Sequence, residues 1–308
     1  MICPSPVTVT SRTGLATAAT FETPIASGGQ PPLVINCTPT SGFTFPIGST
    51  TVTCTATDAR QRSATCSFPV VIAPPPRLSI TRFLAFGDSL TAGEVVSEGS
   101  AGRVHALLID DAKSYPTRLR ESLNSRYTTQ TISVVNRGRS GVKAVDAGPD
   151  LSAFLALNQY DAVLLMDGAN DLLLQDTIAM RAAANAMQQM VRDAKSRRVQ
   201  VLLATLPPQN LDGCCPRRGV GAPLVVPYND SLKLIAATEG VPLVDVYQGF
   251  NGDVTTLVDF DGLHPTAAGY QRIADTFFDI IRSRLEVPAT TTTLTPFSFP
   301  FPSAPRRP

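Results

Sequence analysis

Hydrophobic and polar positions change their pattern near residue 75. Before it, polar and β-branched residues alternate in short segments, most clearly over residues 50–57, and no helical period appears. After it, short apolar runs alternate with longer segments in which apolar residues recur every three or four positions. Alternation is typical of half-buried strands, and short continuous apolar runs are typical of buried parallel strands. The pattern predicts an all-β module followed by an α/β domain.

The α/β part should form a mostly parallel sheet covered by helices on both faces. Its predicted strands are residues 82–86, 132–136, 161–166, 199–206 and 242–247. Its predicted helices are residues 114–123, 150–156, 177–196, 227–239 and 266–285. Within 177–196, Met180, Met187 and Val191 share one helical face, which indicates core packing rather than a cofactor contact.

These patterns divide the chain into four parts. Residues 1–74 predict a small immunoglobulin-like sandwich of about seven short strands, with a turn at 58–62. Residues 75–79 are a proline-rich linker, which favours a stiff, extended spacer. The α/β domain spans residues 80–286. Residues 287–308 are rich in Thr and Pro and predict a disordered tail.

Composition excludes several classes of function and indicates a compartment. The formal net charge of +1 gives no reason to expect a nucleic-acid partner. No apolar run is long enough to span a membrane, and no signal peptide is visible at Met1. Four of the six cysteines (Cys3, Cys37, Cys54 and Cys66) predict two disulfides, with three pairings open, and an extracellular or cell-surface location. Their spacing does not resemble a zinc site.

The other two cysteines, Cys214 and Cys215, are adjacent in a Pro-bounded segment. They predict a structural role in a loop, either as a vicinal disulfide or as reduced thiols, because no spare histidine is available to activate them.

Candidate chemistry begins where the first apolar run of the α/β domain ends in Gly87-Asp88-Ser89. A serine just beyond the carboxyl end of a buried strand is a candidate nucleophile, although Asp88 or Ser89 could instead simply cap a helix. Three further polar stretches, residues 136–141, 166–171 and 261–266, also follow strands or open the last helix. Loops at one edge of a parallel sheet converge in space, so these stretches should meet.

Acyl transfer by Ser89 requires a base, and the chain has only two histidines, His105 and His264. His264 is the predicted base, with Asp261, three residues before it, as the carboxylate that orients the ring. His105 lies in a Gly/Ser-rich stretch typical of an exposed loop. Predicted oxyanion donors are the N–H groups of Ser89 and Gly138 and the side-chain amide of Asn170.

Each of these residues also has a structural interpretation. His264 could help to cap the last helix, Asn170 could belong to an ordinary turn, and 136–141 could be a structural loop. For catalysis to be absent, all of these structural interpretations would have to hold together, at four separate strand ends in sequence order. Catalysis is therefore the favoured hypothesis.

The four blocks together resemble the GDSL/SGNH hydrolase superfamily over residues 80–286. The resemblance implies a flavodoxin-like three-layer α/β/α fold, ester hydrolysis without a cofactor, and the roles named above for Ser89, Gly138, Asn170, Asp261 and His264. The segments 86–93 and 261–270 look most like the lysophospholipase and acyl-hydrolase branch. Lipid, small-molecule and acylated-carbohydrate esters are the implied substrates. A departure from the family pattern is the long stretch 94–111.

Three alternatives remain beside this hypothesis. The enzyme could be a carbohydrate acetylesterase or an acyltransferase. The domain could be an inert extracellular binding or adhesion protein. A metal-dependent hydrolase could use Asp88, Asp171, Asp261 and His264.

Residues 1–74 are similar to a HYR (hyalin repeat) domain, through the segments 36–42, 45–48, 51–58 and 64–68. That family has an immunoglobulin-like fold and occurs in extracellular proteins. It implies adhesion or spacing, with an extracellular partner for the module, rather than catalysis.

Overall fold

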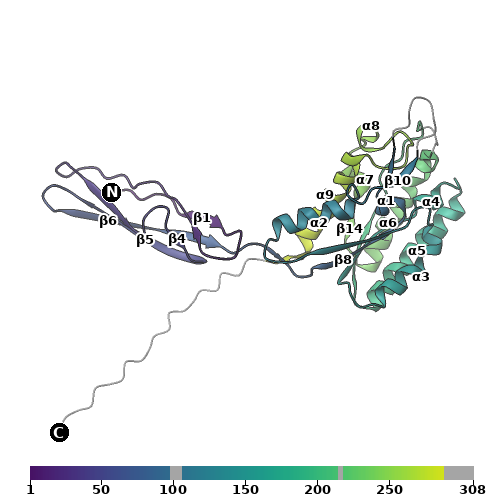
Figure 1. Ribbon diagram of the computed structural model, residues 1–308, viewed down its shortest axis with the longest axis horizontal. Coiled ribbons are helices and arrows are strands. Elements are labelled where there is room, and N and C mark those ends of the chain that lie inside the picture. The colour runs from purple at the N-terminus through teal and green to yellow at the C-terminus, as the bar shows by residue number, and fades with distance from the viewer. Residues whose placement is uncertain (98–105, 214–217, 288–308) are drawn as a thin grey trace, which may run out of the picture. The chain divides into compact units, whose positions relative to one another are not determined.

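The computed structural model describes residues 1–97, 106–213 and 218–287, which form two compact units, Met1–Pro76 and Arg77–Val287 (Figure 1). The predictions made for His105, Cys214, Cys215 and residues 288–308 lie outside the described residues. Among the described helices, none combines the length and the apolar character that a membrane crossing needs.

The N-terminal unit is built on a four-stranded sheet in the order β1-β6-β5-β3. Its long central hairpin pairs β5 (Gly48–Thr57) with β6 (Ser63–Ala73), and β1 (Val7–Thr10) and β3 (Val34–Thr38) lie at the edges. A short pair, β2 (Thr17–Ala18) with β4 (Thr44–Phe45), completes six strands in residues 1–76, where about seven were predicted. Alternate residues of β6 turn inward, and Phe68, Val70 and Ile72 form the core with Phe45 and Val52.

Two disulfides join strands of this unit, Cys37–Cys54 and Cys3–Cys66. Cys54 lies directly opposite Cys37 in one ladder and opposite Cys66 in the next. The sequence left three pairings open, and the structure selects this one.

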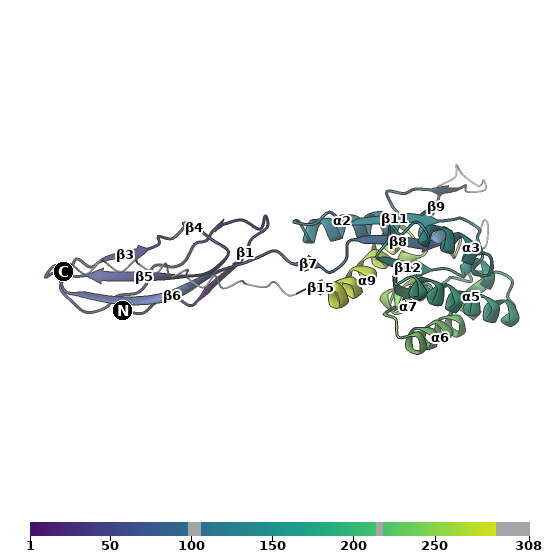
Figure 2. The same cartoon turned by 90° about the horizontal axis from the view of Figure 1, so that it is seen from below.

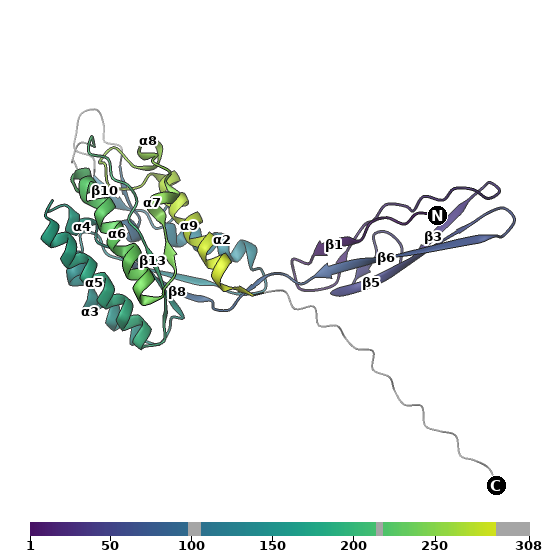
Figure 3. The same ribbon diagram turned by 180° about the vertical axis from the view of Figure 1, so that it is seen from behind.

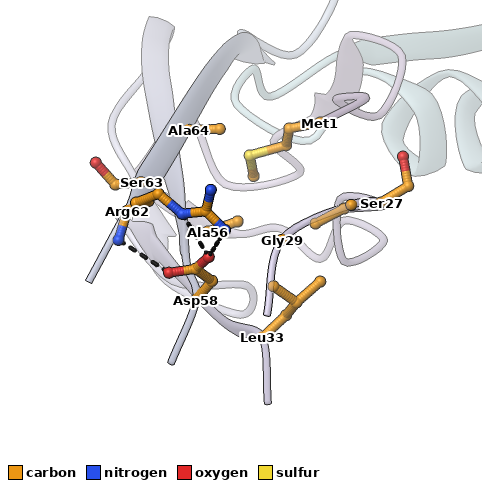
Figure 4. Close-up of a pocket in the computed structure, with 11 residues that line it drawn as sticks. Met1, Ser27, Gly29, Leu33, Ala56, Asp58, Arg62, Ser63 and Ala64 are labelled. Carbon is orange, nitrogen blue, oxygen red and sulfur yellow. Dashed lines mark hydrogen bonds and ion pairs between the residues drawn. The ribbon is translucent and has the colours of Figure 1, made fainter. Parts of the chain in front are cut away.

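The turn between β5 and β6 is fixed by the buried carboxylate of Asp58. It accepts hydrogen bonds from the N–H groups of Gln30, Arg60 and Arg62 and from the Arg62 side chain. These bonds, that of Gln30 first, lower the pKa of Asp58. Figure 4 shows this pair beside a pocket of about 220 Å³ that Met1 and Leu33 also line. Arg62 and Asp58, the charged residues that line this pocket, form an ion pair with each other. Their role is therefore to stabilise the turn.

The second unit contains a five-stranded parallel sheet in the order β11-β8-β12-β13-β14 (Figure 2). The strands are β8 (Arg82–Gly87), β11 (Ser133–Gly138), β12 (Ala162–Met166), β13 (Gln200–Ala204) and β14 (Leu243–Val244). When only the five strands of this sheet are numbered along the chain, this is the flavodoxin-like order 2-1-3-4-5. The predicted fold class is therefore confirmed, and the switch in strand order falls between β8 and β12.

Helices cover both faces of this sheet and complete three layers (Figures 1 and 3). On one face α2 (Tyr115–Arg126) packs against α9 (Ala267–Leu285). On the other, α5 (Thr177–Ser196) lies between α3 (Ala144–Leu155) and α6 (Ala222–Glu239). The face of α5 that holds Met180, Met187 and Val191 is buried, as the periodicity predicted.

Two helices begin about one and a half turns earlier than predicted, α3 at Ala144 and α6 at Ala222. Pro149 lies inside α3 and Pro227 lies inside α6, each as the sixth residue. A proline there removes one hydrogen bond near the helix start, and buried Ala144, Ala147 and Val225 hold the preceding turns against the core. The predicted ranges begin after Pro149 and at Pro227, and both helices extend further toward the N-terminus than those prolines.

Short elements complete the second unit. β7 (Arg77–Leu78) pairs with β15 (Glu286–Val287), so two residues expected in the linker and the first residue expected in the tail lie in strands. The remaining elements are α1 (Ser89–Ala92), β9 (Glu94–Val96), β10 (Leu107–Ile109), α4 (Ala169–Leu172), η1 (Gly219–Gly221), α7 (Val246–Gly249) and α8 (Val254–Leu257).

Candidate active site

The turn after β8 places Ser89 at the start of α1, beside the switch point of the sheet. Asp88 caps this helix through its Oδ1, which accepts from the Leu90 N–H at 2.9 Å. Its Oδ2 accepts from the Ala169 N–H at 3.1 Å, which ties α1 to the start of α4. A Cβ on Gly87 would lie 1.8 Å from the Met166 carbonyl oxygen, so the turn requires glycine. Asp88 thus supports the turn, while the Ser89 hydroxyl is left available.

Ser89, His264 and Asp261 form one hydrogen-bonded line. The Ser89 Oγ lies 3.0 Å from His264 Nε2, and His264 Nδ1 lies 2.6 Å from Asp261 Oδ2. All three are buried, with 3%, 1% and 0% of their surfaces exposed. Because a carboxylate only accepts, the Nδ1 atom bears the proton and the Nε2 lone pair faces Ser89. This is the arrangement in which a serine can pass its proton to histidine as it attacks.

The Asp261 carboxylate is held by more than the histidine. Its Oδ1 accepts from the backbone N–H groups of Leu263 and His264, at 2.9 and 3.0 Å. Burial alone would raise the pKa of Asp261, but the hydrogen bonds and charge of His264 and these two N–H groups lower it. Asp261 is therefore ionised and can stabilise an imidazolium. Thr266, not His264, supplies the side-chain cap of α9.

Two of the predicted oxyanion donors keep an unpaired N–H hydrogen among the described residues. The Ser89 N–H has no hydrogen-bond partner among the described residues. Asn170, in α4, donates one amide hydrogen from Nδ2 to the Val142 carbonyl at 2.7 Å, which fixes the side chain and leaves the second hydrogen.

Gly138 does not offer the free donor that the sequence suggested. Its N–H donates to Asn136 Oδ1 at 3.0 Å. A Cβ on Gly138 would lie 2.1 Å from the Ala92 nitrogen, so glycine is needed there because β11 packs closely against α1, and not because substrate approaches it. The sequence alone did not predict that the Asn136 side chain, two residues away, would accept from the Gly138 N–H.

Gly141, in the loop that follows β11, has the free N–H that was expected of Gly138. Its N–H has no partner among the described residues, its φ is +75°, and a Cβ there would meet open space. The signal was present in the sequence as a second glycine in the stretch 136–141. Which of the two glycine N–H groups is free depends on the Asn136 side chain, which accepts from the Gly138 N–H.

A further side chain at the site, Glu94, was missed altogether. Its Oε2 lies 3.6 Å from His264 Nε2, and the Ser140 hydroxyl donates to the same oxygen. Glu94 directly follows the nucleophile segment and is the first residue of the stretch 94–111, which the sequence marks only as a departure from the family pattern.

Three buried carboxylates surround the turn. Burial raises the pKa of Asp88 to about 6, against the opposing hydrogen bonds from Leu90 and Ala169. Burial, and then the charge of Asp88, raises the pKa of Asp167 well above its usual range. Burial also raises the pKa of Asp171. No group of three His, Cys, Asp or Glu side chains within residues 1–97, 106–213 and 218–287 is arranged to hold a metal ion.

Comparison with known proteins agrees with this architecture. Residues 85–272 match the model of the GDSL-like lipase/acylhydrolase family, and residues 1–72 match the model of the HYR domain. The first match spans more than half of the 308 residues, and the chain belongs to the GDSL-like lipase/acylhydrolase family. It is a serine ester hydrolase with an N-terminal HYR domain. No curated protein matches the chain by sequence.

Solved structures share the fold of the second unit. A lipase/acylhydrolase from Enterococcus faecalis is 21% identical, with a TM-score of 0.54, over 67% of this chain and 97% of its own. Axe2, an acetylxylan esterase from Geobacillus stearothermophilus, is 23% identical, with a TM-score of 0.52, over 66% and 94%. LAE5, a hydrolase from the metagenome of Lake Arreo, Spain, is 21% identical, with a TM-score of 0.53, over 65% and 94%. At these identities the likeness extends to the fold alone.

Proposed function

We propose that Ser89, His264 and Asp261 form a catalytic triad that hydrolyses carboxylic esters through an acyl-enzyme. The observation that supports this most is the buried line of hydrogen bonds, 2.6 Å from Asp261 to His264 and 3.0 Å from His264 to Ser89. Its position at the switch point of a parallel sheet is where ligands bind in such folds.

In the first half of the reaction, Ser89 Oγ attacks the ester carbonyl carbon and passes its proton to His264 Nε2. The negative charge on the carbonyl oxygen is stabilised by the Ser89 N–H, the free amide hydrogen of Asn170 and the Gly141 N–H, which takes the place first assigned to Gly138. The bond to the alcohol oxygen then breaks, and His264 returns the proton to the leaving alcohol.

In the second half, water replaces the alcohol. His264 takes a proton from the water as its oxygen attacks the acyl-enzyme, and a second oxyanion forms in the same hole. Its collapse releases the carboxylic acid and returns the proton to Ser89. Asp261, ionised throughout, stabilises the imidazolium in both halves. No residue outside this set is needed for the proton balance.

We assign the substrates to the lysophospholipase and acyl-ester type, on the segments 86–93 and 261–270. The competing assignments are removal of acetyl groups from carbohydrate, and acyl transfer. Rates on lysophospholipids, p-nitrophenyl esters and acetylated sugars separate the first two, and product analysis with added alcohol detects transfer. The HYR domain and the two disulfides support an extracellular location.

The Ser89→Ala variant tests the triad. It should abolish hydrolysis of p-nitrophenyl acetate while its circular dichroism and melting temperature stay near those of the wild type, because only one buried hydroxyl is lost. Substantial hydrolysis by a folded Ser89→Ala protein would refute the assignment. A variant of an exposed serine on α5, Ser196→Ala, controls for the loss of a hydroxyl elsewhere.

A further inference from the structure

A second carboxylate lies at the proposed base, at the ring nitrogen opposite the one that Asp261 binds. Glu94 Oε2 is 3.6 Å from His264 Nε2, the atom that also contacts Ser89 Oγ. Asp261 already orients the ring from Nδ1. The triad therefore does not account for Glu94.

The structure fixes Glu94 through both its backbone and its side chain. The residue begins β9 directly after Gly93, which ends α1 with a φ of +88°. The Glu94 carbonyl accepts from the hydroxyl of buried Tyr270 at 2.6 Å, and the Ser140 hydroxyl donates to Oε2. Only 9% of the side chain is exposed. Glu94 is thus a positioned, nearly buried group and not a solvated surface charge.

The carboxylate of Glu94 is incompletely satisfied. Its Oε1 has no hydrogen-bond partner in the described part of the chain, and no Lys or Arg there forms an ion pair with it. Oε1 is not among the fully enclosed side-chain oxygens of the described residues, so water can solvate it in the free protein and a donor on the substrate can take the place of that water. Next to a nucleophile, the donor available during turnover is the substrate.

The chemistry locates the part of the substrate that Glu94 meets. His264 Nε2 must protonate the leaving alcohol oxygen, so that oxygen has to come within about 3 Å of Nε2. Glu94 Oε2 lies 3.6 Å from the same nitrogen. The alcohol half of the ester therefore passes beside the carboxylate, and a hydroxyl one or two carbons from the ester oxygen can reach it.

We propose that Glu94, held by Ser140, is a specificity-determining subsite that accepts a hydrogen bond from a hydroxyl group on the alcohol half of the ester. It selects esters of polyhydroxylated alcohols over esters of simple alkyl alcohols. This inference rests on the proposed function of the triad. The hydroxyl could belong to a glycerol or to a sugar, since both place a hydroxyl next to the ester oxygen.

A matched pair of substrates tests the subsite. Glyceryl 1-monoacetate and n-propyl acetate share the acyl group and the three-carbon alcohol and differ in two hydroxyls. A hydrogen bond to a charged group corresponds to about 10- to 100-fold in kcat/KM. The wild type should prefer the glyceryl ester by about that factor, Glu94→Gln should reduce the ratio to a few-fold, and Glu94→Ala should abolish it.

Two further variants control for the loss of charge, and a third substrate shows whether the hydroxyl belongs to a sugar or to a glycerol. Glu121→Gln, at an exposed position on α2, should leave the ratio unchanged. Glu94→Asp keeps the charge and should retain more of the preference than Glu94→Ala. A monoacetylated glucose hydrolysed faster than the glyceryl ester assigns the hydroxyl to a carbohydrate, and the reverse assigns it to a glycerol ester. Either result supports the subsite.

Three results would overturn the proposal. The first is a wild type that shows no preference within the matched pair. The second is a Glu94→Gln variant that slows both esters by one factor, because Glu94 would then only stabilise the imidazolium. The third is a Glu94-dependent preference for acetylcholine over both esters, which would make this a cation site. A wild type that hydrolyses none of these esters contradicts the proposed function itself, which separates the two failures.

Discussion

Replacing Asp261 with Asn is expected to remove most of the activity while preserving the fold. The two side chains have the same shape, but a carboxylate accepts at both oxygens and an amide accepts at one. In the wild type, Oδ1 accepts from the N–H groups of Leu263 and His264, and Oδ2 accepts from His264 Nδ1. An amide can satisfy only one of these two sides.

The buried backbone decides which side is kept. Turning the amide nitrogen toward the backbone would leave two buried N–H groups unpaired, at about 1–3 kcal/mol each. The oxygen should therefore stay on the backbone side, and the NH₂ group should face Nδ1. His264 must then present a lone pair at Nδ1 and place its proton on Nε2, where it cannot accept the proton of Ser89.

The free-energy cost of leaving the two backbone N–H groups unpaired determines how far kcat should fall. A bias of about 2–6 kcal/mol leaves the productive tautomer in roughly one molecule in 30 to one in 10⁴. The Asp261→Asn variant should therefore lose at least about 30-fold in kcat, with a larger loss because the negative charge is gone as well. KM should change little, since Asp261 does not touch substrate.

Steady-state kinetics on p-nitrophenyl acetate measure this loss, with a thermal melt to confirm folding. Asp212→Asn, an exposed carboxylate in a nearby loop, is the matched control and should retain wild-type kcat. A folded Asp261→Asn protein with kcat within threefold of the wild type would show that the carboxylate does not hold the base, and the reasoning from its two oxygens would be wrong.

Three further predictions concern the surroundings of the nucleophile. Asn170→Ala should lower kcat about 100-fold or more by removing one oxyanion donor, as kinetics on the same ester would show; a loss below fivefold would exclude that role. Gly138→Ala should lower the melting temperature and the activity together, because the new Cβ would lie 2.1 Å from the Ala92 nitrogen of α1; an unchanged melt would contradict the packing argument. Asp167→Asn should become more stable relative to the wild type as pH rises from 5 to 8. The raised pKa of Asp167 means that wild-type stability falls once the unfolded carboxyl ionises above about pH 4, and Asn has no such loss. A difference in melting temperature between Asp167→Asn and the wild type that is the same at pH 5 and pH 8 would contradict this prediction.

Much of the fold was predictable because its signals are local. Buried parallel strands such as β8 and β12 are continuous apolar runs, and their ends are marked by Gly-Asp-Ser and Asp-Gly-Ala-Asn. The periodicity of α5 gave both its limits and its buried face. Asp261 and His264 are three residues apart, so their proximity needed no knowledge of the fold.

The features that sequence analysis missed depend on contacts between distant segments. The pairing of Cys37 with Cys54 follows from the register of β3 against β5, which composition does not determine. The Gly138 N–H is occupied only because the Asn136 side chain folds back onto it. Glu94 lies at His264 through long-range contacts, because its carbonyl accepts from the Tyr270 hydroxyl and its Oε2 lies 3.6 Å from His264 Nε2.

The central claim is that Ser89 is the nucleophile, and covalent labelling tests it most directly. A fluorophosphonate reacts with a serine whose proton is taken by a neighbouring base, so the wild type should acquire one label. Peptide mass spectrometry should find that label on Ser89, with none on the Ser89→Ala variant and strongly reduced labelling of Asp261→Asn. A wild-type protein that takes up no label, or that takes it up at another residue and keeps it in Ser89→Ala, would contradict the account.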